Sequence, residues 1–234
     1  MYKTETEKTI LCFGDSNTWG YVTGSIDLDT LLAKRFAFNK RWPGVLQQEL
    51  AEPYRIIEAG LNGRTTNIDD PEWPDRNGLS ALPILLESNS PIDMIIVMLG
   101  TNDMKSRFNR TASDIISGMS EIIDKIRSLK FISGESETKI LVISPPIVTK
   151  EDGFGEDFKN ANKKSSEYAQ QLKHLCKQKS CYHLDASELK FSEIDGVHLE
   201  ERSHQLLGQK IARAVKEINH ELKPTPSQRF SYNQ

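Results

Sequence analysis

The chain has 234 residues, of which 37% are hydrophobic and 27% are charged. That length suggests one domain, or at most two small ones, and the composition excludes a disordered or fibrous chain. Lys and Arg number 30 and Asp and Glu number 33, which gives a formal net charge of −3. Because a nucleic-acid binder needs a concentrated basic face, this balance argues against nucleic acid as a partner.

The amino-terminal segment and the cysteines favour a cytoplasmic protein. The first residues, MYKTETEKTI, are polar where a signal peptide carries its apolar region. The longest apolar run, from Met94 to Leu99, is far too short to cross a bilayer. Cysteines 12, 176 and 181 are too few and too irregularly spaced for a secreted disulfide framework. We therefore expect neither a membrane partner nor secretion.

Short apolar runs alternate with longer amphipathic stretches along the chain. In chain order, the pattern predicts a strand at 9–13, a helix at 42–50, strands at 55–58 and 93–99, a helix that begins near Thr111 and reaches 129, a strand at 139–144, a helix at about 157–178, a strand at 182–184 and a helix at about 200–222. This alternation implies βαβ units, and therefore a parallel sheet with helices on both faces. We expect a single domain over residues 1–222 and a polar, proline-broken tail at 223–234.

Four polar blocks lie in the connections of the predicted sheet. They are Gly14-Asp15-Ser16-Asn17-Thr18-Trp19, Gly60 to Thr66, Gly100 to Asp103, and Asp195 to His198. In an open parallel sheet the active site lies at the carboxyl ends of the strands, where these blocks would meet. Each block alone has an ordinary structural explanation, such as a turn or a helix cap. Their joint occurrence in this order favours a shared site.

The residue types in these blocks suit nucleophilic catalysis. A serine on a tight turn, such as Ser16, can present its hydroxyl to a cleft together with its own N–H. A carboxylate three residues before a histidine, as in Asp195 and His198, can reach the imidazole Nδ1–H and leave Nε2 free. Asn102 can donate its side-chain NH₂ to a developing oxyanion. The pattern is neither a Gly-x-Ser-x-Gly elbow nor a phosphate-binding loop, so nucleotide binding is not expected.

Together the four blocks resemble those of the SGNH (GDSL-type) hydrolases. The segments GDSNTWG, RFAFNKRWPGVL, EAGLNGRTTNIDDP, MLGTNDMK, LVISPP and DGVHL resemble the oligomeric arylesterase and acyltransferase branch of that family. The resemblance covers roughly residues 9–222. It implies a flavodoxin-like α/β fold, with three α/β/α layers around a five-stranded parallel sheet.

The resemblance also implies a role for each residue of the blocks. Ser16 is the implied nucleophile, His198 the base, and Asp195 the group that orients the imidazole. The implied oxyanion hole consists of the N–H groups of Ser16 and Gly63 and the side-chain amide of Asn102. Asp15 and Asp103 are expected to brace the loops through hydrogen bonds. None of these steps requires a metal or an organic cofactor.

The resemblance places further residues along the acyl and alcohol sites. They are Trp19, Tyr21, Lys105, Phe154 and Val197. For Trp19 and Tyr21, packing or an oligomer contact is an equally good explanation. The branch forms closed homo-oligomers, often octamers, in which long loops bury one another. Residues 21–41 and 67–82 would supply those loops here, since both exceed the usual length of a connection.

A second cluster of potential ligands does not favour a metal. His174, Cys176, Cys181 and His183 fall within ten residues. However, residues 174 and 176 would face about 200° apart on a helix, so they cannot share one ion. The strand and helix already account for the apolar cysteines, and no metal site is expected.

Three functions remain open from the sequence. The first is a serine esterase that hydrolyses short acyl (acetyl, aryl) esters of small molecules through an acyl-enzyme and that can transfer the acyl group to alcohols. The second is a carbohydrate O-acetylesterase with the same three catalytic residues. The third is a non-catalytic α/β binding module, although a binder needs no complete catalytic set.

Overall fold

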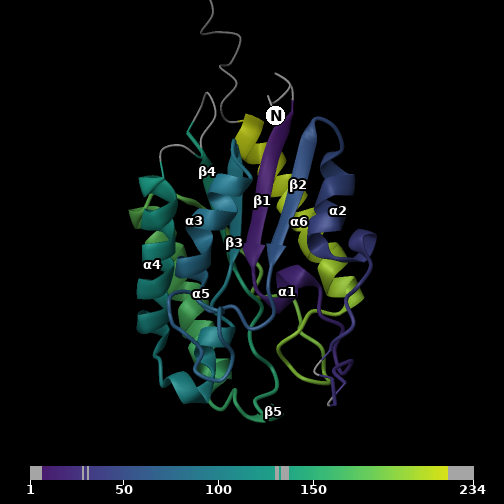
Figure 1. Ribbon diagram of the computed structural model, residues 1–234, viewed down its shortest axis with the longest axis vertical. Coiled ribbons are helices and arrows are strands. Elements are labelled where there is room, and N and C mark those ends of the chain that lie inside the picture. Colours follow the sequence, from purple (N-terminus) through teal and green to yellow (C-terminus); the bar gives the residue numbers. More distant parts are fainter. Residues whose placement is uncertain (1–6, 28, 31, 130–131, 133–136, 221–234) are drawn as a thin grey trace, which may run out of the picture.

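The computed structural model describes residues 7–27, 29–30, 32–129, 132 and 137–220, and its centre is a five-stranded sheet in the order β2-β1-β3-β4-β6 (Figure 1). Its strands are β1 (Lys8–Gly14), β2 (Tyr54–Gly60), β3 (Met94–Met98), β4 (Lys139–Ser144) and β6 (Tyr182–Asp185). All neighbouring strands are parallel. A short strand that the sequence did not predict, β5 (Gly153–Glu156), lies outside this sheet.

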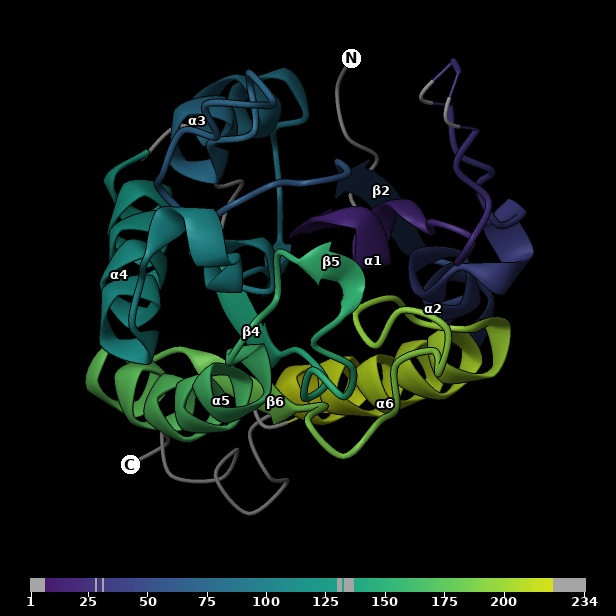
Figure 2. The ribbon, with the colours of Figure 1, turned by 90° about the horizontal axis from the view of Figure 1, so that it is seen from below.

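Helices cover both faces of the sheet. They are α1 (Ser16–Trp19), α2 (Trp42–Leu50), α3 (Gly78–Ser88), α4 (Ala112–Ser128), α5 (Ala161–Gln178) and α6 (Glu201–His220). In the view along the sheet, α2 and α6 lie on one face and α3, α4 and α5 on the other (Figure 2). The predicted three-layer α/β/α fold is therefore confirmed. None of the helices in the described ranges is long and apolar enough to span a bilayer.

The central strands are apolar over most of their length because helices bury them from both sides. Every residue of β3 is buried, as are all residues of β1 after Lys8. Both strands point toward the lower end of the molecule in Figure 1, where α1 follows β1 directly. The connections after β1, β2 and β3 therefore meet at one edge of the sheet.

Four of the six described helices, α2, α4, α5 and α6, agree with predicted ranges. Thr111 and Asp114 form the expected capping box of α4. The helix predicted from about 157 begins only at Ala161, because Asn160 has a left-handed backbone (φ 65°). Helix α3 was not predicted at all, and Pro83 lies inside it, where proline removes a helical hydrogen bond and weakens the sequence signal. The end of the last predicted helix at 221–222 and the tail at 223–234 lie outside the described residues.

Candidate active site

The turn after β1 places Ser16 at the edge of the sheet. The Asp15 side chain caps α1 by accepting a hydrogen bond from the Asn17 N–H at 2.9 Å. Ser16 is the first residue of α1, so its N–H has no partner within the helix. The helix ends after one turn at Gly20, whose φ of 90° is the left-handed conformation that favours glycine. Ser16 therefore presents both its hydroxyl and its N–H at the same point.

The side chains of Ser16, His198 and Asp195 form a chain of hydrogen bonds. His198 Nε2 lies 2.9 Å from Ser16 Oγ, and His198 Nδ1 lies 2.7 Å from Asp195 Oδ2. All three residues are buried. The structure thus brings together the three residues that the sequence analysis placed in the first and fourth blocks.

Asp195 is held as a carboxylate. Its Oδ1 accepts hydrogen bonds from the N–H groups of Val197 and His198, both at 3.0 Å. Burial alone would raise the pKa of Asp195, but the hydrogen bond and charge of His198 and the two backbone donors outweigh burial and hold the pKa below its ordinary value. An ionised Asp195 fixes the Nδ1–H tautomer of His198 and stabilises its protonated form.

Asn17, to which the sequence analysis gave no role, ties the serine turn to the histidine loop. Its side-chain NH₂ donates to Val197 O at 3.0 Å, and its carbonyl oxygen accepts from the Leu199 N–H at 2.8 Å. These two bonds flank His198 on both sides along the chain. Nothing in the spacing of the sequence reveals these contacts, because they join positions 180 and 182 residues apart.

The predicted oxyanion donors lie on the neighbouring connections. Gly63 follows β2 with a φ of 78°, and among the described residues its N–H donates no hydrogen bond. Asn102, in the 3-10 helix Asn102–Met104 after β3, donates through Nδ2 to Arg64 O at 3.1 Å. That bond uses one amide hydrogen and leaves the second for a ligand. Gly63, Asn102 and Ser16 all line one cavity.

Buried charges brace the connections that carry Gly63 and Asn102. The Asp103 carboxylate, fully buried, accepts from the Thr66 N–H at 3.0 Å and from the Thr66 hydroxyl at 2.5 Å, and it pairs with Arg110 at 2.6 Å. Burial raises the pKa of Asp103 to about 6 and that of Asp15 to about 7, against the hydrogen bonds that lower both. Both carboxyl groups therefore make the loop contacts that the sequence analysis expected of them.

Arg64 is a second residue that sequence reasoning left without a role. Its Nη1 donates to Gly14 O at 2.7 Å and to Ala59 O, so it joins the ends of β1 and β2. The guanidinium lies over the Phe13 ring at 4.5 Å, and burial lowers its pKa to about 10. It thereby fixes the distance between the serine turn and the Gly63 loop.

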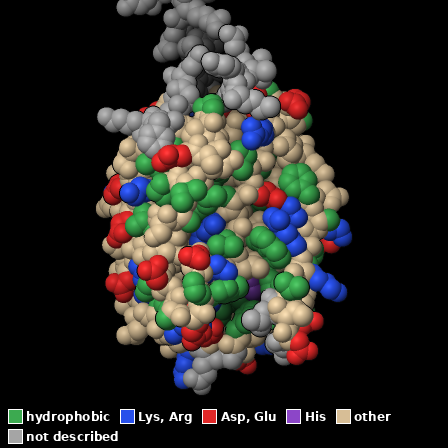
Figure 3. Space-filling model, in the orientation of Figure 1, with side chains coloured by type: hydrophobic (Ala, Val, Ile, Leu, Met, Phe, Trp, Pro, Cys, Tyr) green, Lys and Arg blue, Asp and Glu red, His purple; other side chains and the backbone are tan. Residues whose placement is uncertain are grey.

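A cavity of about 260 Å³ opens over these groups. Of the residues expected along the substrate sites, Tyr21, Lys105, Phe154 and Val197 line it together with Ser16 and His198, whereas Trp19 does not. Trp19 instead lies beneath the Arg35 guanidinium, 5.1 Å from ring to cation. Figure 3 shows hydrophobic side chains interspersed with Lys and Arg at the lower end of the molecule, where this edge of the sheet lies.

One wall of the cavity is aromatic. The Tyr21 ring stacks on the His198 ring, with centroids 4.1 Å apart and planes at 30°. Phe154, from β5, meets the same imidazole edge-on at 5.6 Å, and it contacts Phe158 at 6.2 Å. His198 is therefore enclosed by two aromatic rings beside the point where Nε2 meets Ser16.

Another part of the cavity wall is polar. Lys105 is only 7% exposed, and burial together with the nearby Arg107 lowers its pKa. Arg107 also lines the cavity and pairs with Asp70 at 2.8 Å and with Asp157 at 3.2 Å. The cavity therefore offers charged and hydrogen-bonding groups as well as an aromatic surface.

The histidine and cysteine cluster at 174–183 is not gathered around a common point. Over the part of the chain that the structure describes, no group of three or more His, Cys, Asp or Glu residues could hold a metal ion. His183 Nε2 instead hydrogen-bonds Ser144 Oγ at 2.8 Å, and burial raises the pKa of Cys176 to about 12.

Comparisons with known proteins agree with this geometry. The model of the GDSL-like lipase/acylhydrolase family matches residues 12–206. The inhibitor-bound structure of M. smegmatis aryl esterase is 38% identical, with a TM-score of 0.82 and coverage of 90% of this chain and 99% of the other. Est24, a carbohydrate acetylesterase from Sinorhizobium meliloti, is 34% identical, with a TM-score of 0.82 and coverage of 91% and 100%. No curated protein matches the sequence.

Proposed function

This chain belongs to the GDSL-like lipase/acylhydrolase family and is a serine esterase, and from that premise we propose that Ser16, His198 and Asp195 are its catalytic residues. The observation that carries the proposal is the unbroken chain of hydrogen bonds from Ser16 Oγ through His198 to Asp195. Ser16 and His198 both face the cavity, so an ester can reach them.

In the reaction that we propose, His198 Nε2 takes the proton of Ser16 as its Oγ attacks the ester carbonyl. The oxyanion accepts hydrogen bonds from the N–H groups of Ser16 and Gly63 and from the Asn102 amide. His198 then returns the proton to the leaving alcohol, and an acyl-enzyme on Ser16 remains. A water molecule, activated by the same imidazole, releases the carboxylic acid and restores the serine. Asp195 stabilises the imidazolium throughout.

We propose short acyl groups and aryl alcohols as the preferred substrate parts. A cavity of about 260 Å³ is small for a long acyl chain. The leaving oxygen must lie near His198 Nε2, and the rings of Tyr21 and Phe154 adjoin that point and suit a flat aromatic leaving group.

Carbohydrate deacetylation is a second candidate, favoured by the polar wall. Lys105, Arg107 and Asp157 all line the cavity and can exchange hydrogen bonds with sugar hydroxyls. The kcat/KM for acetylated sugars, compared with that for phenyl acetate, distinguishes the two substrate classes.

The deciding experiment is the hydrolysis of p-nitrophenyl esters, acetate through octanoate, by wild type and by Ser16→Ala. We expect acetate to be cleaved fastest and Ser16→Ala to lose at least ~10⁴-fold in kcat. Preference for octanoate would contradict the short-acyl proposal, and an active Ser16→Ala would contradict the assignment of the nucleophile.

We also propose that an alcohol can replace water in the second half of the reaction. The aromatic wall beside His198 excludes water from one face of the acyl-enzyme and binds an apolar acceptor. Dilute alcohol should therefore give the new ester alongside the acid, and product analysis that finds only acid at high alcohol concentration would contradict this.

Assembly into a homo-oligomer is the remaining proposal. Ile26, Trp73 and Phe154 line the cavity and yet are 41%, 41% and 38% exposed. Exposed apolar side chains grouped at a site opening mark an interaction surface. Light scattering should give a multiple of the chain mass, an octamer by analogy with the branch that the sequence resembles, and a monomer would contradict the proposal.

A further inference from the structure

The connection between α1 and α2, residues 20–41, supplies one wall of the cavity. Tyr21, at its start, stacks on His198, and Ile26 and Ala33 also line the cavity. A connection of this length needs anchors if its side chains are to hold one position. The main anchor is a carboxylate on a different element, Glu58 of β2.

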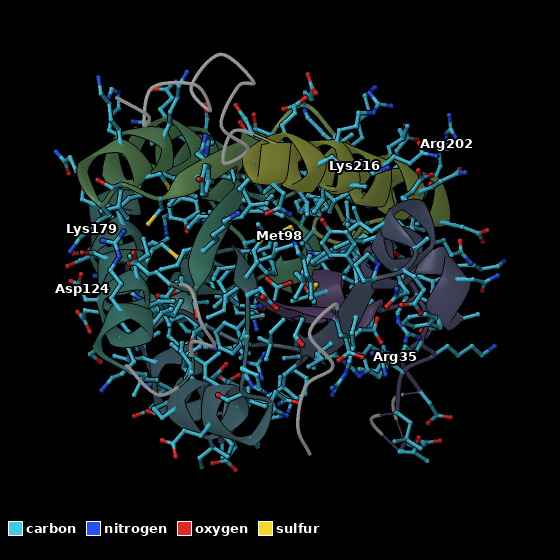
Figure 4. All side chains as sticks on the ribbon, turned by 90° about the horizontal axis from the view of Figure 1, so that it is seen from above. Arg35, Met98, Asp124, Lys179, Arg202 and Lys216 are labelled. Carbon is cyan, nitrogen blue, oxygen red and sulfur yellow. The ribbon has the colours of Figure 1, made fainter. Side chains whose placement is uncertain are left out.

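Glu58 binds two arginines of this connection. Arg41 makes a two-pronged contact, with Nε 2.8 Å from Oε1 and Nη2 2.5 Å from Oε2. Arg35 Nη2 lies 3.2 Å from the same Oε2. The side chains of Arg41 and Glu58 are only 9% and 14% exposed, so water screens their interaction weakly. We call Glu58, Arg35 and Arg41 the Glu58 clamp. Arg35 lies on the α2 side of the molecule, far from Asp124 and Lys179 (Figure 4).

Both arginines of the clamp hold the backbone around Gly20, next to the serine turn. Arg35 Nε donates to Trp19 O at 2.5 Å, and Arg35 pairs with Tyr21 in an antiparallel bridge. Arg41 passes so close to Gly20 that a Cβ there would overlap the arginine side chain. The residues on either side of Gly20 are thus held by the Arg35 guanidinium and by the aliphatic part of the Arg41 side chain, and both guanidinium groups are bound by Glu58.

We propose that Glu58 is a positioning residue for catalysis, which acts through Arg35 and Arg41 to hold Tyr21 against the His198 ring. The proposal rests on the proposed role of His198. The bonds to Asp195 and Ser16 hold the two ring nitrogens of His198, and the stacked Tyr21 ring limits rotation of the imidazole about the line between them. Nε2 then stays aligned with the leaving oxygen as well as with Ser16. Without the Glu58 carboxylate, the two neighbouring guanidinium groups lose the negative charge that they share, and they repel.

The test compares substituted phenyl acetates, whose shape is nearly constant while the acidity of the leaving phenol varies. A poor leaving group depends on proton donation by His198 more than a good one does. Glu58→Gln should therefore lower kcat/KM for phenyl acetate about tenfold more than it lowers kcat/KM for p-nitrophenyl acetate. Complete loss of a general acid typically costs ~10²–10⁴-fold, and a misaligned imidazole should lose only a small part of that effect. A loss of folded protein would lower both rates equally and leave their ratio unchanged.

Glu201→Gln is the matched control. It removes the ion pair that Lys40, in the same connection, makes with Glu201 at 2.8 Å, where both side chains are about half exposed. The control should leave the rate ratio at the wild-type value. If Glu58→Gln does not fold, Arg35→Gln tests the same anchor. The Arg35 side chain is 35% exposed, so its replacement should disturb the core less.

The outcomes separate this proposal from the proposed function. A changed ratio in Glu58→Gln or Arg35→Gln, with an unchanged ratio in Glu201→Gln, supports the clamp. Unchanged ratios in both clamp variants overturn it. Activity that survives in Ser16→Ala in the same assay would instead overturn the catalytic assignment on which the clamp rests.

Discussion

The two sides of the cavity are held by different kinds of interaction. On the histidine side, the rings of Tyr21 and Phe154 enclose His198, and Asp195 is its charged partner. On the oxyanion side, the Asp103 carboxylate is fully buried and paired with Arg110. The difference follows from the proposed chemistry. His198 gains and loses a proton in each cycle and needs a surrounding that tolerates both states, whereas the oxyanion donors must keep one geometry.

The two sides also respond to pH in opposite directions. Burial lowers the pKa of His204, beside the histidine side, to about 3, so the unfolded chain binds a proton there before the folded one does. Burial raises the pKa of Asp103 to about 6, so the folded chain holds a proton there that the unfolded chain has lost. As the pH falls from about 6 to about 4, His204 therefore contributes a loss of stability and Asp103 contributes a gain.

The largest effect on stability is expected from Asp103→Asn. The change leaves Arg110, whose side chain is 11% exposed, without its carboxylate, which should cost about 3–5 kcal/mol of the free energy of unfolding. Urea denaturation measures the loss. Asp124→Asn removes an ion pair of similar length, 2.6 Å to Lys179, on the exposed face of α4 and should cost less than about 1 kcal/mol (Figure 4). Equal losses in the two variants would contradict the view that burial makes the difference.

Asn102→Ala should slow the chemical step with little change in binding. Removal of one oxyanion donor typically lowers kcat by ~10²–10³, or about 3–4 kcal/mol, with KM nearly unchanged. Asn102→Asp keeps the shape of the side chain but replaces the NH₂ donor by an oxygen, so it should be at least as slow. An unchanged kcat with a raised KM would mean that Asn102 binds the ground state alone.

On the histidine side, Asn17→Ala should destabilise the fold by about 2–3 kcal/mol. The change leaves two buried backbone groups, Val197 O and the Leu199 N–H, without their partners. Asn17→Asp keeps an acceptor for the Leu199 N–H and loses only the donor, so its loss in thermal denaturation should be smaller. If both variants unfold like wild type, Asn17 does not hold the two loops together.

Sequence reasoning predicted the five strands of the central sheet, four of the six helices described and the four polar blocks, because each depends on residues close together in the chain. The Asp195 to His198 spacing, for example, lies within one loop. The roles of Asn17 and Glu58 were not predicted, because their partners are fixed only when distant strands and loops pack together. Helix α3 was not predicted for a local reason, because Pro83 interrupts the helical pattern.

Trp19 shows the opposite limit. Its place in the first block makes it a candidate for substrate contact, and the turn that carries Ser16 does follow from the sequence. The direction of its side chain, however, is set by Arg35, which reaches it from a connection whose path no periodicity encodes. Positions along the chain therefore predict which loops meet, but not which side chains of those loops face the cavity.

The smallest expected effect is an acid sensitivity that depends on His204. The residue is fully buried, and its Nδ1 accepts from the Trp42 N–H at 3.4 Å. Since its pKa falls from an ordinary 6.5 to about 3 on folding, its neutral form is favoured in the folded chain. The resulting stability is fully present above about pH 6.5 and is lost progressively as the pH falls toward 3. By pH 5 the loss amounts to about 2 kcal/mol.

His204→Gln keeps a hydrogen-bond acceptor for Trp42 but cannot take up a proton. The difference in free energy of unfolding between wild type and this variant should therefore be constant above about pH 7 and shift in favour of the variant by about 2 kcal/mol at pH 5. In Asp103→Asn the pH-dependent part of the difference should have the opposite sign, because a carboxyl group with a raised pKa stabilises the fold on the acid side. If the difference in free energy of unfolding between wild type and His204→Gln stays constant with pH, burial does not keep the His204 imidazole neutral. The contrast between the two sides of the cavity would then rest on ion pairing alone.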